Sequence, residues 1–292
     1  MPGAERLQPR APDGDAQTGA PSGASGGGDG GGGGGAEGTV GKALGVLDRV
    51  AAFGRPVRFS ELLEGSPYPK ATLYRLVQTL TQQRMLVHDP ESGTYAPGLR
   101  LVRMAHAAWA QSSLAPLARR HLDALAADMD AVAHLAQLDG GSVLYLDKRA
   151  PARAVAMYSE AGKVGPAYCT GVGKAMLAHL PEPALEAVLA QQSWHPYTPS
   201  TIAGPDAMRA ELAEVRAAGF ALDREEHEPG IICAAVPVLG PSGRAQAAVS
   251  ITSSTARRGL ADMVAAVPRL RAAVDAIRGE LRDWRFPHHE GG

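Results

Sequence analysis

The feature that most constrains the fold is a run of three short helical patterns followed by a hairpin pattern, all within residues 39–98. In the first pattern, apolar side chains recur from Val40 to Val50 every three or four residues, which is the spacing of one helix face. Gly54 and Pro56 follow and predict the end of this helix. A helix this short depends on tertiary packing of its apolar face, and the segments that follow supply the partners.

Two further helices are predicted before the hairpin. Ser60 can cap a short helix over Glu61–Glu64, and Pro69 suits the first position of a third helix. The apolar stripe of the third helix consists of Leu73, Leu76, Val77 and Leu80. This i, i+3, i+4, i+7 spacing puts all four side chains on the face that points toward a core.

A β-hairpin follows the third helix. Residues 85–88 and 94–96 have the pattern of two strands, separated by the turn sequence Asp89–Gly93. Three helices followed by a hairpin is the element order of a winged helix-turn-helix, so we expect a DNA-binding domain over residues 39–98. Residues 39–100 carry eight Lys or Arg against five Asp or Glu, a modest positive charge that suits a nucleic-acid partner.

The two ends of the chain differ from the rest in composition. Residues 1–38 are a Gly-, Ala- and Pro-rich stretch, and we expect a disordered tail because so few apolar side chains cannot offset the entropy of ordering it. A second flexible tail is expected over residues 285–292. No apolar run approaches the ~20 residues of a membrane span, and no secretory signal pattern is present. These features favour a cytoplasmic protein.

The remaining sequence alternates strands and helices. We expect a linker helix over residues 99–116, with a break near Ser112, and an α+β domain over residues 117–284, built as a GAF-like antiparallel sheet with flanking helices. Asp139-Gly140-Gly141 predicts a hairpin between two strands, and a third strand is expected over Ala154–Tyr158. The other expected elements are strands at Ile232–Val238 and Ala245–Thr252 and helices beginning near Gly171, Asp206 and Met263.

The third helix is the candidate for reading DNA. Opposite its apolar stripe, or to one side of it, lie polar side chains suited to bases or phosphates, namely Lys70, Thr72, Tyr74, Arg75, Gln78 and Thr79. Arg can grip guanine through two hydrogen bonds, Gln can pair with adenine, and Lys and Thr can contact phosphates or bases. The alternative is that these residues form only the solvated face of a small helix. The wing itself is acidic, so its phosphate contacts would depend on backbone N–H groups, Ser92 or Arg84.

Two ordered groups of motifs carry a family resemblance. The first group is Gly41–Leu47, Pro69–Leu76 and Gly93–Tyr95, and the second is Gly171–Ala178, Tyr197–Ile202, Asp223–Glu226, Gly230–Val238, Ser242–Arg244 and Val249–Thr252. Together they resemble the DNA-binding and effector domains of IclR-type bacterial transcriptional regulators, from residue 40 to about residue 284. Ala71 departs from the Ser that the family often has there, so one possible phosphate contact is missing.

The resemblance implies a small organic effector at the turn Gly171-Val172-Gly173, in a pocket with apolar walls and polar groups. Free N–H groups at a helix start suit a carboxylate or phosphate on physical grounds as well. The other expected lining residues are Met157, Asp223, Ile231, Cys233, Ser250 and Thr252. The structural alternatives are that the glycines only permit close packing, that Cys233 is a small buried apolar group, and that Asp223 caps a turn.

Cysteine and histidine usage leaves one further alternative open. Cys169 and Cys233 are the only cysteines, far apart in sequence, so no disulfide framework is indicated. With Asp223 and His227 they could converge on zinc, or form a thiol centre, in a metal- or thiol-based sensor or redox-active ligand-binding domain. No metalloprotease, P-loop or nucleophile-elbow motif lies in the folded region. We therefore expect a protein that is not an enzyme, with no catalytic residues, no cofactor and no metal.

The sequence thus predicts a repressor or activator whose binding to double-stranded operator DNA is controlled by a small organic-acid effector. A homodimer or tetramer is expected, because one winged helix covers only one half-site. Asp223 favours an effector hydroxyl or a protonated partner beside the carboxylate, since a bare second carboxylate would be repelled.

Overall fold

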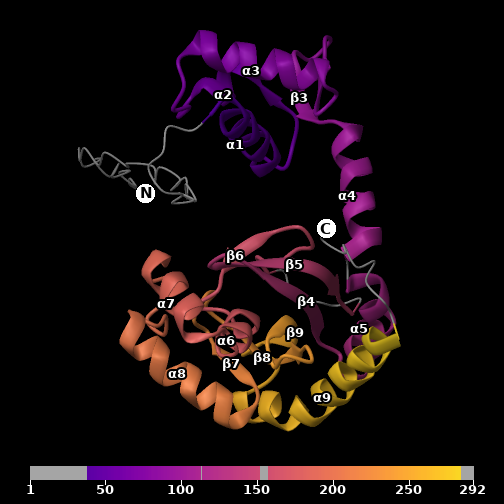
Figure 1. The fold of residues 1–292 in the computed structure, drawn as a ribbon, viewed down its shortest axis with the longest axis vertical. Coiled ribbons are helices and arrows are strands. Elements are labelled where there is room, and N and C mark those ends of the chain that lie inside the picture. Colours follow the sequence, from indigo (N-terminus) through magenta and orange to yellow (C-terminus); the bar gives the residue numbers. More distant parts are fainter. Residues whose placement is uncertain (1–37, 113, 152–156, 284–292) are drawn as a thin grey trace, which may run out of the picture. The chain divides into compact units, whose positions relative to one another are not determined.

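The computed structural model describes residues 38–112, 114–151 and 157–283. The N-terminal domain contains α1 (Thr39–Ala52), β1 (Val57–Arg58), α2 (Phe59–Leu63), α3 (Lys70–Gln82), β2 (Leu86–Asp89) and β3 (Thr94–Pro97) (Figure 1). Its strands pair antiparallel in the order β1-β3-β2, with Val57 opposite Tyr95 and Leu86 opposite Pro97. The predicted winged helix-turn-helix is therefore confirmed, and β1 is an addition that the sequence pattern did not predict.

One apolar cluster holds this domain together. The predicted stripe of α3 is buried, and it packs against Val46, Leu47 and Val50 of α1 and against Tyr95 of β3. Burying an aliphatic side chain of this size stabilises the fold by about 1.5–3 kcal/mol, so this stripe is what orders the short helices.

Two predictions at helix ends were wrong. Ser60 lies inside α2, and Arg58 occupies the N-cap position. The carboxylate of Glu61 accepts the backbone N–H of Arg58 at 2.8 Å, which satisfies a free donor at the helix start without a hydroxyl. Pro69 is the N-cap of α3 and not its first residue. Pro69 has extended backbone angles and its carbonyl accepts the N–H of Leu73, so the helix begins one residue later than predicted.

A long helical segment follows, made of α4 (Leu99–Ser112) and α5 (Ala115–Met129). The end of α4 confirms the break predicted near Ser112. Asp130, in a left-handed conformation, ends α5. Within the described part of the chain, no helix has the combination of length and apolarity that crossing a membrane requires.

The C-terminal domain is a six-stranded antiparallel sheet covered by helices. Its elements after α5 are β4 (Val132–Asp139), β5 (Ser142–Arg149), β6 (Val164–Pro166), α6 (Gly171–Leu177), α7 (Glu182–Gln191), α8 (Pro205–Ala218), β7 (Ala221–Arg224), β8 (Ile231–Leu239), β9 (Ala245–Ser254) and α9 (Leu260–Asp283). The strand order is β6-β5-β4-β9-β8-β7. This confirms the predicted α+β class with its antiparallel sheet and flanking helices.

The third strand of this domain is not where the sequence pattern placed it. Most of Ala154–Tyr158 lies outside the described residues, and Met157 and Tyr158 are not in a strand. The strand next to β5 is β6, with Val164 opposite Leu144. The Gly-Pro composition of this edge strand hides it from pattern analysis.

The sheet is covered on both faces. Helices α5 and α9 pack on one face, and α6, α7 and α8 pack on the other. Along β9 the side chains alternate between the two layers: Val249 and Ile251 face α5 and α9, and Ala248 faces α6. Residues at even positions of β9 therefore share a side with α6.

Two glycines let α6 approach its neighbours closely. A methyl group added at Gly173 would lie 2.1 Å from the carbonyl oxygen of Ala167, and one added at Gly171 would lie 2.5 Å from the sulfur of Cys233. These distances are far below van der Waals contact. The close-packing role considered for these glycines is therefore present in the structure.

We predict that Gly173→Ala destabilises the C-terminal domain by roughly 1–3 kcal/mol, because the new methyl group can be accommodated only by moving backbone. Gly279→Ala is the matched control, since this position in α9 has nothing within 4 Å of the added carbon. The control should be neutral or stabilising by about 0.5–1 kcal/mol, the difference in helix propensity. Urea unfolding followed by circular dichroism measures both, and equal midpoints for the two variants would contradict the prediction.

Candidate functional site

The predicted DNA-reading residues of α3 differ in their exposure and in their partners within the protein. Lys70, Tyr74 and Arg75 are exposed. Tyr74 makes an edge contact with the ring of Phe59, 5.7 Å between centroids, which holds it in place on the surface. These three side chains are available to a nucleic acid.

Among the other predicted DNA-reading residues, Gln78 and the exposed Thr79 have partners within the protein. Thr72 and Gln78 are half-buried, and Gln78 hydrogen-bonds the phenol of Tyr95. The hydroxyl of Thr79 donates to the carbonyl of Arg75, at 2.9 Å. These groups therefore contribute to the shape of the helix surface more than they offer free donors.

A cavity of about 40 Å³ lies in the C-terminal domain. Eight of the nine predicted effector residues line it, namely Met157, Gly171, Val172, Asp223, Ile231, Cys233, Ser250 and Thr252. Gly173 does not line it, because it faces the backbone of Ala167. Since one water needs roughly 10–15 Å³ on this scale, the cavity has room for a ligand of only a few non-hydrogen atoms.

The strand register explains why these residues meet. Asp223 of β7 is opposite Cys233 of β8, which is opposite Thr252 of β9. In the neighbouring row, Ser250 of β9 is opposite His134 of β4. Ser250 and Thr252 are two positions apart in β9, and residues at this spacing share a face of the sheet. The polar groups therefore form one patch on the face that carries α6.

His134 is a central pocket residue that the sequence analysis missed. Its Nε2 lies 2.8 Å from the hydroxyl of Ser159, and its Nδ1 lies 3.4 Å from each of the hydroxyls of Ser250 and Thr252. Burial and then the charge of Lys148 lower the pKa of His134 to about 3, so the imidazole is neutral. A neutral ring has one donor and one acceptor nitrogen, which suits a network of hydroxyls.

The lining also contains residues that were not predicted to contact an effector. These are Tyr145, Tyr158, Ser159, Thr170, His227 and Glu228. The ring of His227 stands between those of Tyr158 and Tyr197, at 5.2 and 4.7 Å. Burial lowers the pKa of His227 as well.

Asp223 and Cys233 are neighbours in the cavity lining. Asp223 is buried and its Oδ1 accepts the backbone N–H of Glu226 at 2.8 Å. Burial, and after it the charge of Glu226, raises the pKa of Asp223 to about 7. Burial also raises the pKa of the Cys233 thiol, whose sulfur accepts the N–H of Gly171. The turn-capping and buried-thiol roles considered for these residues are thus combined with a place in the cavity.

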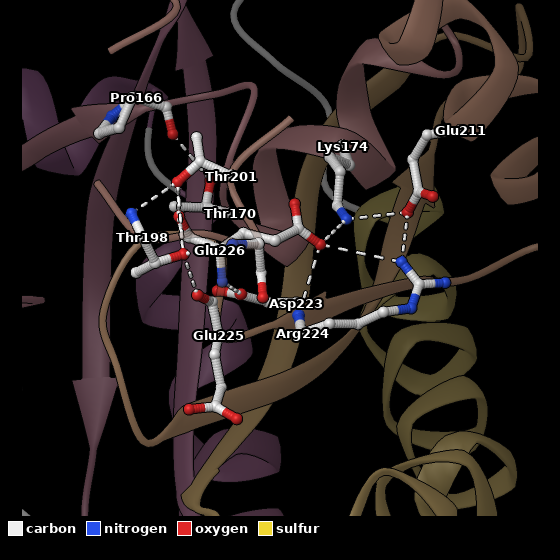
Figure 2. A network of polar contacts seen from close by, with 11 residues as sticks. Pro166, Thr170, Lys174, Thr198, Thr201, Glu211, Asp223, Arg224, Glu225 and Glu226 are labelled. Atoms are coloured by element: carbon white, nitrogen blue, oxygen red, sulfur yellow. Dashed lines mark hydrogen bonds and ion pairs between the residues drawn. The ribbon is translucent and has the colours of Figure 1, made fainter. Parts of the chain in front are cut away.

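An ion-pair network with the buried Lys174 and Glu226 at its centre adjoins Asp223, which lines the cavity (Figure 2). The ammonium of Lys174, which has no solvent exposure, pairs with Glu226 and, at 2.8 Å, with Glu211 of α8. Arg224 of β7 pairs with the same two carboxylates, at 2.9 Å for Glu211 and 3.8 Å for Glu226. The motif lysine of α6 therefore holds α8 and the segment after β7 together.

The same segment is fixed from its other side by two threonines. The hydroxyls of Thr198 and Thr201 donate, each at 2.6 Å, to the carbonyls of Glu225 and Glu226 (Figure 2). The carboxylate of Glu225 in turn accepts the N–H of Gly230 at 2.6 Å. Motifs far apart in the sequence thus determine the position of Asp223.

The thiol and metal alternatives receive no support from the arrangement. Cys169, Asp223, His227 and Cys233 are all described residues, and no three His, Cys, Asp or Glu side chains in the described ranges form a group that could hold a metal ion. Cys169 is buried outside the cavity lining, and burial raises its pKa. Neither thiol is in an environment that favours the reactive thiolate.

Comparison with known proteins gives consistent matches over both domains. Residues 39–90 match the IclR helix-turn-helix domain, and residues 106–278 match the bacterial transcriptional regulator IclR C-terminal domain. The HTH-type transcriptional regulator XynR of Escherichia coli (strain K12) is 32% identical over 219 residues, 75% of this chain and 87% of XynR.

Two crystal structures show the same fold. An IclR-type transcriptional regulator from Silicibacter sp. TM1040 is 30% identical, with a TM-score of 0.72 over 84% of this chain and 96% of that chain. The Thermotoga maritima IclR structure is 27% identical, with a TM-score of 0.66 over 83% and 98% of the two chains.

We predict that Lys174→Met destabilises the C-terminal domain by about 3–5 kcal/mol, because two carboxylates then lose a buried cation. Burial already raises the pKa of Glu226, and loss of the ammonium raises it further. A carboxyl group whose pKa is higher in the folded state lowers the stability of the protein as pH rises. The loss of stability caused by Lys174→Met should therefore be smaller at about pH 5 than at about pH 8.

Arg209→Met is the control for this prediction. It breaks the half-exposed pair of Arg209 with Glu186 on the surface. Solvent screens such a pair, so its loss should change the unfolding midpoint far less than Lys174→Met does. A Lys174→Met deficit that is small, or that does not depend on pH, would show that the network is not a stabilising constraint.

Proposed function

Because this chain belongs to the IclR family of bacterial transcriptional regulators, we propose that a small organic acid bound in its C-terminal domain controls the binding of its winged helix-turn-helix to operator DNA. The family assignment makes the chain a DNA-binding transcriptional regulator with a C-terminal effector-binding domain, and not an enzyme. The observation that carries the proposal is the convergence of polar groups from β4, β7, β8, β9 and α6 on one small cavity. A concave site with a few convergent polar groups is a common feature of small-molecule sites.

In the proposed DNA complex, α3 lies in the major groove. Arg75 contacts a base edge, Lys70 contacts a phosphate, and Tyr74 packs against the backbone or a thymine methyl group. Thr72, Gln78 and Thr79 complete the helix surface. The support for this assignment is the exposure of Lys70, Tyr74 and Arg75 together with the order of elements around α3.

The proposed effector is a compact acid with one carboxylate. The start of α6 offers the backbone N–H of Val172, and the hydroxyls of Ser250 and Thr252 offer further donors. Met157 and Ile231 supply apolar walls. The small volume of the cavity favours a ligand of a few non-hydrogen atoms.

We also propose a homodimer, or a tetramer of two such dimers, with the DNA-binding domain over residues 39–98, a linker helix over 99–116 and the effector domain over 117–284. Two half-sites give the affinity that one winged helix lacks. Apolar side chains on α1 and α4 are exposed in the single chain and suit a second copy, namely Val40, Leu44, Leu99, Val102 and Met104.

For the DNA surface, we expect Arg75→Ala to weaken operator binding by roughly 1–3 kcal/mol and to relax the preference at one base pair. Lys70→Ala should weaken binding to all sequences alike and reduce the salt dependence by about one phosphate contact. A gel-shift titration against the DNA upstream of its own gene measures both effects. The control is Arg103→Ala, which removes the same charge from α4. If Arg75→Ala and Lys70→Ala both bind like the wild type, α3 is not the reading helix.

For the effector, we expect Ser250→Ala to lower affinity by roughly 0.5–3 kcal/mol, depending on the charge of the group that the hydroxyl contacts. Operator binding without effector should stay intact. Ser253→Ala is the matched control, because this buried hydroxyl is on the opposite face of β9 and outside the cavity lining. Thermal-shift screening of keto, hydroxy and aromatic monoacids measures binding. Stabilisation by a metal or a neutral amine, but by no acid, would overturn the proposed effector class.

A further inference from the structure

The ion-pair cluster beside the cavity, in which Lys174, Asp223 and Glu226 are buried and Arg224 is exposed, contains more carboxylates than cations. Lys174 and Arg224 face three acidic groups, which are Glu211, Glu226 and Asp223. Lys174 and Arg224 pair with Glu211 and Glu226, and among the ion pairs of the described residues Asp223 takes part in none. One negative charge in this cluster is therefore left without a partner.

The cavity lining does not supply the missing positive charge. Its described residues include no Lys or Arg, and they include a second carboxylate, Glu228. The two histidines of the lining, His134 and His227, have lowered pKa values because they are buried, so they are neutral at physiological pH. A ligand carboxylate entering this cavity meets hydroxyls, N–H groups and Asp223, with no cation between the two acids.

Two ionised carboxylates that share a site with no cation between them repel each other strongly. The repulsion disappears when one proton is shared between them, because one acid then donates a hydrogen bond to the other. Asp223 is placed to be that donor: its Oδ1 already accepts the N–H of Glu226, and the side chain lines the cavity.

We propose that the pocket binds its monocarboxylate effector together with one proton from solvent, which Asp223 holds in a hydrogen bond to the ligand carboxylate. This inference rests on the proposed function and specifies the ligand further. The site accepts an acid with a single negative charge and rejects a dianion of the same size.

The surroundings of Asp223 favour its protonated form near neutral pH. The pKa of Asp223 is raised to about 7, first by burial and then by Glu226, so Asp223 takes up a proton far more readily than an ordinary aspartate. The titratable or charged groups that surround Asp223 or line the same cavity are Glu226, Lys174, Arg224, Glu211, Cys233, Cys169, Tyr145, Tyr158, His134, His227 and Glu228. Of the carboxyl groups, Glu211 and Glu226 are paired with cations and lie outside the lining, and Glu228 contacts the backbone N–H of Tyr158.

The test uses the full-length protein and three monocarboxylate probes, which are glycolate, lactate and oxamate. The probe that gives the largest thermal shift is titrated by calorimetry between pH 5.5 and 8.5. Below about pH 6 Asp223 already holds its proton, so Kd should be constant and proton uptake close to zero. Above about pH 7 Kd should rise by up to about tenfold per pH unit, and uptake, measured in two buffers of different ionisation enthalpy, should approach one proton.

Two variants assign the proton to its holder. Asp223→Asn keeps a donor but cannot titrate, so its Kd should be independent of pH and within about threefold of the wild-type value at low pH. Glu226→Gln removes the second cause of the raised pKa, so the pH at which affinity begins to fall should move lower. Glu228→Gln should leave the pH dependence in place. If Glu228→Gln abolishes the pH dependence of Kd and Asp223→Asn does not, Glu228 holds the proton and the proposal fails.

The isosteric pair oxamate and oxalate tests the charge rule directly. Oxamate should bind at least about tenfold more tightly than oxalate at pH 8, and oxalate binding as tightly would overturn the proposal. A bound monocarboxylate with no pH dependence and no proton uptake would overturn it too, while leaving the proposed effector function intact. If no acid binds although the operator does, the effector class and this inference fail together. If Asp223→Asn does not fold, the wild-type proton uptake and the shift in Glu226→Gln still decide.

Discussion

The C-terminal domain depends on the ion pairs that the buried ammonium group of Lys174 makes with two carboxylates. The ammonium group connects α6 to α8 through Glu211 and to the segment after β7 through Glu226. Removing such charges from water costs several kcal/mol per ion, so the network adds less to net stability than its short contacts suggest. The network instead determines the position of the segment that carries Asp223, because Glu226 must reach both Lys174 and Arg224. The geometry of the cavity that is proposed as the effector site follows from that constraint.

The second determinant of the pocket is the alternation of side chains in the sheet. Both faces are covered by helices, so a polar residue on either face is buried and needs partners. On the α6 face, Ser250, Thr252 and His134 stand where the neighbouring positions are alanines. They satisfy one another through the neutral imidazole. The sheet therefore contains a small polar patch within an apolar core, and the residues of that patch line the cavity.

The parts of this structure that could be predicted are those with a local signal. The stripe of α3, the Gly140-Gly141 turn and the alternation of Ser250 and Thr252 each follow from spacing along the chain. Elements without a periodic pattern were missed: β1 has two residues, β6 is an edge strand with Gly and Pro, and β7 and α7 have no strong signature. His134 has no motif around it, and only the register with Ser250 brings it to the pocket. Gly173 looked like an effector contact because sequence alone cannot show that its neighbour is the backbone of Ala167.

An effector changes DNA binding only if it interacts differently with the two states of the regulator, so its contacts must reach an element that has two arrangements. Asp223 offers such a path, because its carboxylate accepts the N–H of Glu226 and feels the charge of the Glu226 side chain. A ligand that changes the charge on Asp223 therefore changes how strongly Glu226 holds Lys174 and Arg224. By reciprocity, any rearrangement that shifts these ion pairs alters the affinity of the pocket by the same factor. Under the proposed function, Asp223, which has no cation partner, is the group through which effector binding acts on the network that positions α6 and α8.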